Sequence, residues 1–232
     1  MSKFWRGVLF FGKGMEEGDK EAALTQFSSR LIPWFQSKGF VYRRAEESFV
    51  RVEGDMSWKV GPGLSLYPDR FEIRPMACVR HEQVERIFHT VSDAPEQIQK
   101  ASATVLWSWA VEKRTPKPNS FIVERSSQVL SAGTFTQHFF KKWVEPFFQE
   151  HSNLNLISES FNDSRAILRA KHFVDWFDLL GRALITARLT ERADYEILKD
   201  EYRRNFAAGQ SSHPLSSFDA LIRILGEGPP WT

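Results

Sequence analysis

Cysteine is nearly absent from this sequence: Cys78 is the only one among 232 residues. A single cysteine excludes an intramolecular disulfide and any zinc site built from several cysteines. The six histidines form neither a His-x-x-x-His pair nor a cluster with cysteine, so the sequence predicts no metal and no other cofactor. Because Cys78 lies in an apolar stretch, we expect a buried, unreactive thiol rather than a nucleophile.

Long apolar runs are also missing, and none approaches the length of about 20 residues that a membrane-spanning helix needs. The segment Lys3–Phe11 resembles the start of a signal peptide, but its apolar run ends at Gly12 and no cleavage site follows. We therefore expect no membrane span and a cytoplasmic location. We expect this segment to form a strand or short helix that packs Phe4, Val8 and Phe11 on the core.

Recognisable catalytic and phosphate-binding motifs do not occur. The glycine-rich pieces Gly12-Lys13-Gly14 and Gly61-Pro62-Gly63 lack the spacing of a dinucleotide-binding or Walker loop. No Gly-x-Ser-x-Gly elbow is present. The nearest approach to a metal or catalytic cluster is His172 with Asp175 and Asp178, which a hydrogen bond on a helix surface explains without a metal. The sequence therefore assigns no catalytic residue.

Neither sign of charge dominates, because the formal net charge is +2. Proteins that bind DNA or RNA without sequence preference usually carry a broad cationic field. Nucleic-acid binding is therefore not the favoured function.

Aromatic residues, by contrast, are numerous, with 20 phenylalanines against 4 tyrosines. The pairs Phe139-Phe140, Phe147-Phe148 and Trp176-Phe177 place rings on more than one side of their helices. We favour a thick aromatic core between a sheet part and a helical part. The alternative is an exposed aromatic patch that binds a partner.

The clearest local pattern is an amphipathic helix whose apolar stripe runs from Leu24 to Phe35 at three- and four-residue spacing. Gly39 is expected to end it, since glycine reaches the left-handed conformation that a helix C-terminus commonly needs. Pro33 lies inside the stripe and should kink the helix or split it near Leu31.

Alternating strands follow the helix and predict an antiparallel meander, because the connections are too short for parallel crossovers. We expect strands at 41–45, 48–53, 56–60, 64–67 and 70–79, with a turn at 67–70 and a bulge or edge at 61–63. The expected apolar face, packed under the helix, consists of Val50, Val52, Trp58, Val60, Leu64, Leu66, Phe71 and Ile73. The expected opposite face consists of Arg51, Glu53, Lys59, Arg70, Glu72 and Arg74.

The charged face is the candidate partner-binding surface, and it is cationic with carboxylates interspersed. Cross-strand ion pairs on a solvated sheet face are the plainer interpretation of the same pattern. The candidate binding residues are Arg51, Lys59, Arg70, Glu72 and Arg74.

Helical patterns dominate after His81. They predict a helix with Val84 and Phe88, and a second one that Asp93 and Pro95 start and that buries residues through Trp109. Further expected elements are a linker at 113–120, a strand at 121–124, a helix starting at Ser131 or Thr134 that Pro146 bends or ends, and helices at 164–191, 194–206 and 217–225. The predicted organisation is a sheet part at 1–112 and a mainly helical part at 119–232, packed together. The fold class is therefore α+β, with an antiparallel sheet, a covering N-terminal helix and a helical C-terminal half.

A family resemblance covers about the first half of the chain. A helix followed by Lys38-Gly39-Phe40, then Ser48-Phe49-Val50-Arg51-Val52, then a turn-rich meander ending at Val79, resembles bacterial domain families of unknown function found among polymorphic-toxin immunity proteins. The resemblance implies a small cytoplasmic protein that binds and blocks a cognate toxin. It brings no catalytic residues with it.

Three function classes follow from these observations. The favoured one is a non-enzymatic protein-binding module, an immunity protein whose partner is a toxin. The second is an enzyme whose site is assembled from separate elements, for which His172, Asp175 and Asp178 are the nearest candidates. The third is a nucleic-acid binder that uses Arg43, Arg44, Arg51, Arg70 and Arg74 with Trp58 or Tyr67. The sequence does not predict an oligomeric state.

Overall fold

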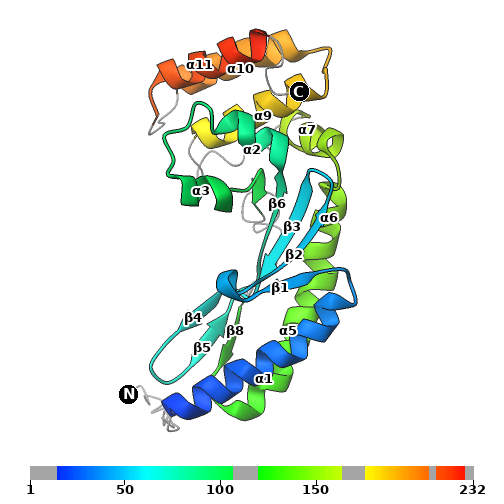
Figure 1. The fold of residues 1–232 in the computed structure, drawn as a ribbon, viewed down its shortest axis with the longest axis vertical. Coiled ribbons are helices and arrows are strands. Elements are labelled where there is room, and N and C mark those ends of the chain that lie inside the picture. The colour runs from blue at the N-terminus through cyan, green and yellow to red at the C-terminus, as the bar shows by residue number, and fades with distance from the viewer. Residues whose placement is uncertain (1–14, 107–119, 164–175, 209–212, 228–232) are drawn as a thin grey trace, which may run out of the picture.

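The computed structural model describes residues 15–106, 120–163, 176–208 and 213–227. The chain has an α+β fold in which an N-terminal helix precedes two antiparallel sheets and the C-terminal half is helical (Figure 1). The fold class predicted from the sequence is confirmed.

Helix α1 runs without a break over Glu17–Gln36. It buries Ala23, Phe27, Leu31 and Phe35 on one side, which is the predicted stripe. Gly39 follows with φ +82°, in the left-handed region expected at a helix end. The expected split near Leu31 is wrong: Pro33 lies in the last helical turn, and burial of Leu31 and Phe35 on either side of it holds that turn in place.

Sheet A has five antiparallel strands in the order β1-β2-β3-β6-β7. Its register is set by the tight turn at Gly54-Asp55, which places Glu53 opposite Met56. The predicted strands at 48–53 and 56–60 are present, and the one expected at 41–45 ends at Arg43, where the 3-10 turn Arg44–Glu46 begins. The strands are β1 (Val41–Arg43), β2 (Ser48–Glu53), β3 (Met56–Gly61), β6 (Met76–His81) and β7 (Val105–Leu106).

Sheet B is a smaller antiparallel sheet in the order β4-β5-β8. The predicted strand at 70–79 is divided between the two sheets, because Pro75 cannot donate to a ladder. Opposite it Gly63 has φ +56°, and a Cβ there would lie 2.0 Å from the Arg74 carbonyl oxygen. The strands are β4 (Leu64–Leu66), β5 (Phe71–Ile73) and β8 (Phe121–Val123).

The predicted burial pattern of β5 is confirmed. Phe71 and Ile73 are completely buried, whereas Arg70 and Glu72 are partly exposed and Arg74 is exposed. The turn before β5 is closed by a hydrogen bond from the Tyr67 amide to the Arg70 carbonyl oxygen at 2.9 Å. This turn was also predicted.

The predicted faces of β2 are wrong. Val50 is the register partner of Lys59, and Arg51 is the partner of Trp58. Residues directly opposite each other in an antiparallel pair share a face, so Val50 and Val52 lie on the face opposite Trp58. Arg51 consequently shares the helix-covered face with Trp58. Alternation within one strand does not reveal which of its two rows faces the core, and a one-residue error exchanges them.

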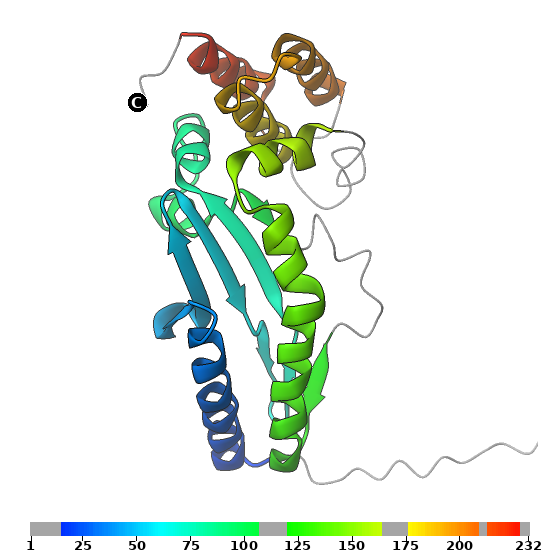
Figure 2. The ribbon, with the colours of Figure 1, turned by 90° about the vertical axis from the view of Figure 1, so that its right-hand side faces the viewer.

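Helices cover one face of the sheets, as Figures 1 and 2 show for α1, α5 and α6. The space between them is filled with rings: Phe35 stacks on Phe49 at 4.1 Å between centroids and meets Phe140 at 5.2 Å. Phe40 lies 5.9 Å from Phe140 as well. Among the exposed large apolar side chains of the described ranges, Tyr67 alone is aromatic. The aromatic residues thus form core rather than a surface patch in this part of the chain.

A continuous helical segment follows β8 and passes through Pro146. Five residues before α6 form a π-helical turn, and Pro146 lies at the start of α6. The π turn interrupts the α-helical hydrogen-bond ladder just before Pro146, where the missing proline donor would otherwise break it. Pro146 therefore does not end the segment, which was one of the two expected outcomes. The elements are the 3-10 turn Ser126–Gln128, α5 (Val129–Phe139), the π turn Phe140–Val144 and α6 (Glu145–Glu150).

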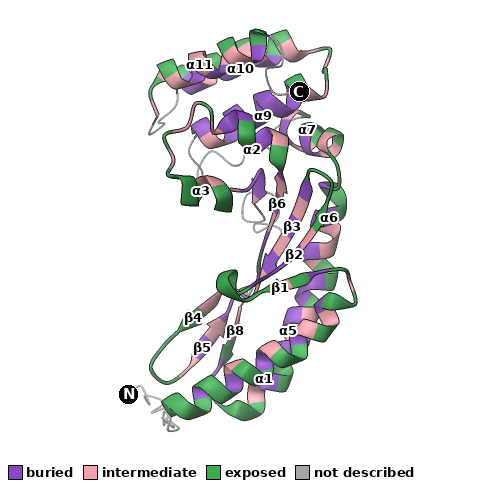
Figure 3. Cartoon of the chain, viewed as in Figure 1, coloured by how far each residue is buried: buried purple, intermediate pink, exposed green. Residues whose placement is uncertain are grey.

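The remaining helices gather at the other end of the molecule (Figure 1). Helix α9 is buried along almost its whole length, with α2, α7, α10 and α11 packed around it (Figure 3). The expected helix through residues 105–106 is wrong: α3 ends at Ala101, the Thr104 amide bonds the Val79 carbonyl oxygen at 2.9 Å, and β7 joins sheet A. The helices are α2 (Glu82–Phe88), α3 (Glu96–Ala101), α7 (Leu154–Asn162), α9 (Trp176–Leu189), α10 (Tyr195–Ala208) and α11 (Leu215–Gly226).

Several expectations lie outside the described residues. They are the packing of Phe4, Val8 and Phe11, the burial of Trp109, the linker over 113–119, and the helix over 164–175. The division of the chain at 112–119 stays a prediction. Strand β8, which follows that boundary, pairs with β5, which precedes it.

Candidate binding face of the five-stranded sheet

One face of sheet A is turned away from α1, α5 and α6, and we call it the open sheet face (Figures 1 and 2). A row of register partners crosses all five strands on this face: Val41, Val50, Lys59, Cys78 and Leu106. The neighbouring rows contain Val52, Ser57 and Arg80 on one side, and Arg43, Ser48, Gly61 and Met76 on the other.

The open sheet face exposes apolar side chains that a solvated sheet face would not normally carry. Val41, Val52 and Met76 are 66%, 58% and 62% exposed. Antiparallel sheets commonly cover one face and present polar residues on the other. This face instead carries both kinds of residue, with valines and a methionine beside lysine and arginine.

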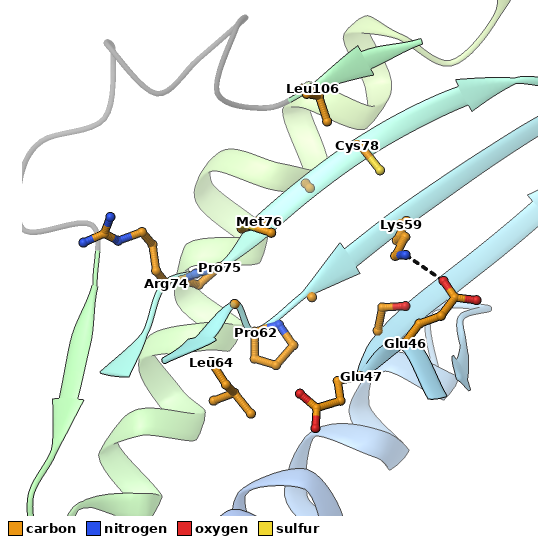
Figure 4. A pocket seen from close by; sticks show the side chains of 14 residues that line it. Glu46, Glu47, Lys59, Pro62, Leu64, Arg74, Pro75, Met76, Cys78 and Leu106 are labelled. Atoms are coloured by element: carbon orange, nitrogen blue, oxygen red, sulfur yellow. Dashed lines mark hydrogen bonds and ion pairs between the residues drawn. The ribbon is translucent and has the colours of Figure 1, made fainter. Parts of the chain in front are cut away.

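Two adjoining cavities lie along this face. The first, the Gly61 cavity, has a volume of about 430 Å³ and is mostly apolar, as Figure 4 shows for Pro62, Leu64, Met76 and Leu106. The second, the Arg80 cavity, has a volume of about 570 Å³ and lies toward α3. Glu46, Lys59 and Cys78 line both. Volumes of this size are typical of ligand and anchor-residue pockets.

An ion-pair cluster stands where the two cavities meet. Lys59 Nζ donates to Glu46 at 2.6 Å, and Arg43 Nη1 donates to the other oxygen of the same carboxylate at 3.3 Å (Figure 4 shows the Lys59–Glu46 bond). The hydrogen bond from Lys59 holds the pKa of Glu46 below its ordinary value. Glu46 is therefore ionised at neutral pH and acts as a fixed acceptor rather than as a general acid.

Arg80 organises the far end of the Arg80 cavity. Its Nε and Nη2 donate to the two oxygens of Glu82 at 2.6 and 2.9 Å, and its Nη1 donates to the Gln99 carbonyl oxygen at 2.8 Å. These bonds tie the C-terminal end of α3 to β6. The Arg80 hydrogen bond also lowers the pKa of Glu82.

The two cavities differ in charge. Arg43, Lys59, Arg80 and Lys100 line the Arg80 cavity with two carboxylates, which leaves a net charge of +2. The Gly61 cavity has two cations and two carboxylates and is neutral. One end of the open sheet face is thus cationic and the other apolar.

Cys78 lies between the cavities. Full burial was expected, but the residue is only partly buried. Burial raises the pKa of its thiol to about 11. The thiolate fraction at neutral pH is very small, so the thiol is a poor nucleophile.

The five predicted binding residues do not form one surface. Lys59 lies on the open sheet face, whereas Arg51 lies on the covered face with its guanidinium over the rings of Trp58 (4.5 Å) and Phe40 (5.4 Å). Arg74 lines the rim of the Gly61 cavity.

The remaining two predicted residues, Arg70 and Glu72, belong to sheet B and the turn before it. Glu72 pairs with Arg74 at 3.2 Å, and Arg70 pairs with Asp69 at 3.7 Å while its guanidinium lies 4.9 Å from the Tyr67 ring. Both pairs join residues of one segment rather than of two strands, so they are not the cross-strand ion pairs of the plainer interpretation.

Arg80 and Lys100 were missed as contributors to the candidate site, and Arg43 was named only for the nucleic-acid alternative. The signal for Arg80 was available, because pairing β2 with β3 through the tight turn at 54–55 puts Ser57 and then Arg80 in the same row as Val52. Lys100 comes from α3, and no local pattern in the sequence brings that helix over the sheet.

A buried polar network joins α2 to α9 and is the strongest alternative site. Glu85 is completely buried, and its oxygens accept from Arg182 Nε and Nη2, both at 2.8 Å. Burial opposes ionisation of Glu85, but the Arg182 guanidinium outweighs it and lowers the pKa. Thr104 Oγ1 donates to the same carboxylate at 2.9 Å.

The network contains a serine and a histidine, but their arrangement is not that of a catalytic triad. His89 Nε2 lies 2.8 Å from Ser102 Oγ, and Glu85 approaches this same nitrogen at 3.5 Å. The opposite nitrogen, which an orienting acid would contact, faces Ser92 Oγ at 3.2 Å. Ser102 Oγ is also bonded to Arg80 and Glu85, so its hydrogen-bonding capacity is used within the protein.

The candidate metal cluster cannot be placed, because His172 and Asp175 lie outside the described residues. Asp178 lies in α9 and its carboxylate accepts from Arg182 Nη1 at 3.2 Å. Within the described ranges no three His, Cys, Asp or Glu residues are grouped in a way that could hold a metal ion. In those same ranges, no helix has the length and apolar character required to cross a membrane.

Comparison of the chain with family models, curated proteins and solved structures produced no match.

Proposed function

We propose that this chain is a non-enzymatic protein-binding module that uses the open sheet face to cover a partner protein, and that the partner is a toxin which the chain blocks. The observation that carries the proposal is the pairing of exposed Val41, Val52 and Met76 with a cavity on a sheet face that α1, α5 and α6 leave free. The toxin assignment rests on the resemblance to immunity-protein families.

The composition of this face suits a protein interface. Protein interfaces combine an apolar centre, which is dehydrated on binding, with a polar and charged rim. Here Val41, Val52 and Met76 provide apolar area, and the Lys59–Glu46 and Arg80–Glu82 pairs provide charged groups held in fixed positions. Inhibition would be steric and electrostatic, since nothing on this face supplies an activated nucleophile.

Two observations weigh against the alternatives. The carboxylates with shifted pKa values on this face, Glu46 and Glu82, are shifted downward by cations, which does not favour acid catalysis. Neither cavity is lined by an aromatic side chain, whereas single-stranded nucleic acids are usually held by stacking on aromatic rings.

The test compares two glutamate variants, Val52→Glu and Leu130→Glu, at positions whose side chains are almost equally exposed. Val52 on the open sheet face is 58% exposed, and Leu130 on α5 is 57% exposed. The partner to use is the product of the gene that neighbours this one, co-expressed and purified with each variant. We expect Val52→Glu to weaken the complex at least tenfold, because a desolvated carboxylate at an interface opposes association, and Leu130→Glu to leave it unchanged.

Circular dichroism and thermal unfolding of both variants show whether the fold is retained. A folded Val52→Glu protein that binds as tightly as the parent chain would eliminate the open sheet face. If only Leu130→Glu weakens binding of the partner, the interface lies on α5 instead.

A further inference from the structure

We infer that the partner presents an acidic segment with an apolar side chain beside it, the carboxylate lying in the Arg80 cavity and the apolar side chain in the Gly61 cavity. The inference rests on the proposed function and specifies the chemistry of the partner. It follows from the difference in charge between two cavities that share a wall.

The Arg80 cavity favours a carboxylate because its cations outnumber its anions. Arg43, Lys59, Arg80 and Lys100 line it with Glu46 and Glu82. Lys59 is partly exposed, and its ammonium group has three donors, of which the bond to Glu46 uses one. An incoming carboxylate can therefore be bonded without breaking the Lys59–Glu46 pair.

The Gly61 cavity exists because one position in a row of the sheet, Gly61, has no side chain. Gly61 lies opposite Met76, and a Cβ built on it would meet the Glu47 carbonyl oxygen at 3.6 Å and Ser48 Cβ at 3.9 Å, which are ordinary contacts. A larger residue would therefore fit the backbone and fill the space. Pro62, Leu64 and Met76 form the apolar wall (Figure 4).

The floor of this cavity also carries an unused hydroxyl group. Ser48 is 99% buried and lines the cavity, and its Oγ has no hydrogen-bond partner among the described residues. A buried hydroxyl without a partner is unfavourable. A main-chain carbonyl oxygen of the bound segment that accepts a hydrogen bond from Ser48 relieves that cost, which the apolar side chain alone would not.

The two cavities meet at Glu46, Lys59 and Cys78, so one short segment can reach both. In an extended segment neighbouring residues alternate in direction, and a carboxylate and an apolar side chain two residues apart point the same way. Nucleic acid could also meet the cationic cavity through its phosphates, but it would leave the apolar cavity empty.

The probes are acetylated, amidated hexapeptides whose binding is followed by amide NMR spectra of the full chain. The acidic-apolar probe is Glu-Ser-Leu-Ser-Glu-Ser, in which the leucine lies two residues from each glutamate; the charge-reversed probe is Lys-Ser-Leu-Ser-Lys-Ser, and the probe without apolar side chains is Glu-Ser-Ser-Ser-Glu-Ser. An oligothymidine serves as the nucleic-acid probe. We expect the acidic-apolar peptide to bind at least tenfold more tightly than the other probes, with shifts centred on Lys59, Cys78 and Met76.

Two variants locate the binding. Arg43 and Arg203 have side chains that are 52% and 51% exposed, and each is paired with a carboxylate, Glu46 and Asp219. Arg43→Glu should lower the affinity for the acidic-apolar peptide about tenfold, and the matched control Arg203→Glu should leave it unchanged. Gly61→Val, which fills the apolar cavity, should abolish the preference for the acidic-apolar peptide over the acidic-serine peptide, and Gly61→Ala tests the same position with less added volume.

The inference is overturned if the charge-reversed peptide or the oligothymidine binds as tightly as the acidic-apolar one, if no probe binds saturably, or if Arg203→Glu weakens binding as much as Arg43→Glu does. Such an outcome leaves the proposed function standing if Val52→Glu still disrupts the complex with the whole partner. Conversely, if the acidic-apolar peptide binds to these cavities but Val52→Glu does not weaken the complex with the whole partner, the proposed function is wrong.

Discussion

Glu47 shows how backbone strain is placed at the rim of the open sheet face. Its φ is 45°, a left-handed conformation that only glycine and a few polar residues adopt readily. Glu47 ends the 3-10 turn that carries Glu46, and its amide donates to the Arg44 carbonyl oxygen at 3.2 Å. Glu191 adopts a similar conformation, with φ 51°, after α9. The two residues therefore form a natural pair for comparing a site residue with a structural one.

We predict that Glu47→Gly and Glu191→Gly each raise the free energy of unfolding by up to about 1 kcal/mol. Relief of the left-handed strain favours glycine, and its larger chain entropy in the unfolded state offsets part of the gain. Urea unfolding followed by circular dichroism measures both. If Glu47→Gly weakens partner binding while Glu191→Gly does not, the carboxylate of Glu47 contributes to the interface. A loss of stability in either variant would show that the glutamate side chain makes a compensating contact.

Sequence reasoning worked for residues whose neighbours decide their conformation. Gly39 and the turn at 67–70 follow from local chemistry, and both are where the sequence puts them. The side of the sheet on which Arg51 lies depends on pairing with another strand, and local alternation does not contain that information. The missed residue Lys100 depends on the position of a whole helix.

At the scale of elements, the pairing of α2 with α9 is the most specific contact in the helical end. The Glu85–Arg182 ion pair is enclosed by both helices, and the Arg182 guanidinium lies 3.9 Å from the Phe88 ring. A Cβ on Gly181 would come within 3.0 Å of the same ring. The helices therefore meet closely on one side of Phe88 and through an ion pair on the other.

We predict that Glu85→Gln destabilises the protein by about 3 kcal/mol, because it leaves the Arg182 charge buried without its bidentate partner. The pKa of Glu85 is lowered in the folded state, so its contribution is present above the ordinary value of 4.5 and is lost as the pH falls through the folded-state pKa. The stability of the parent chain should fall on acidification in that range, and Glu85→Gln should remove part of this dependence. Urea unfolding across neutral to acidic pH checks it; equal slopes for the two proteins would contradict the assigned role.

Element boundaries were easier to predict from the sequence than element partners. Strands β2 and β3 and helices α10 and α11 lie close to their expected ranges, because apolar periodicity is a local signal. The π turn before Pro146 and the strand β7 were not predicted. Both depend on contacts made elsewhere: α6 must continue to bury Phe147 and Phe148, and β7 forms only because β6 offers it an edge.

At the scale of the whole molecule, helices cover one face of sheet A and leave most of the other face uncovered. Helices α1, α5 and α6 cover one face of sheet A, while α3 and the 3-10 turn at 44–46 only border the other (Figure 1). The buried aromatic residues follow this inequality, since Phe35, Phe49 and Phe140 all lie on the covered side. A sheet covered on one face was predicted from the sequence, but Val50 and Val52 were placed on the covered face, so the apolar character of the open sheet face was not predicted.

The exposed valines of the open sheet face also determine how the chain behaves when no partner is present. An apolar patch in water favours weak self-association, and the charged residues that line the Arg80 cavity oppose it locally. We expect light scattering to show an apparent mass that rises with protein concentration, and Val52→Glu to suppress the rise while Leu130→Glu does not. A concentration-independent mass for the parent chain would contradict this expectation. If it holds, the same substitution improves colloidal solubility and removes binding, so solubility screening of this chain would select against its activity.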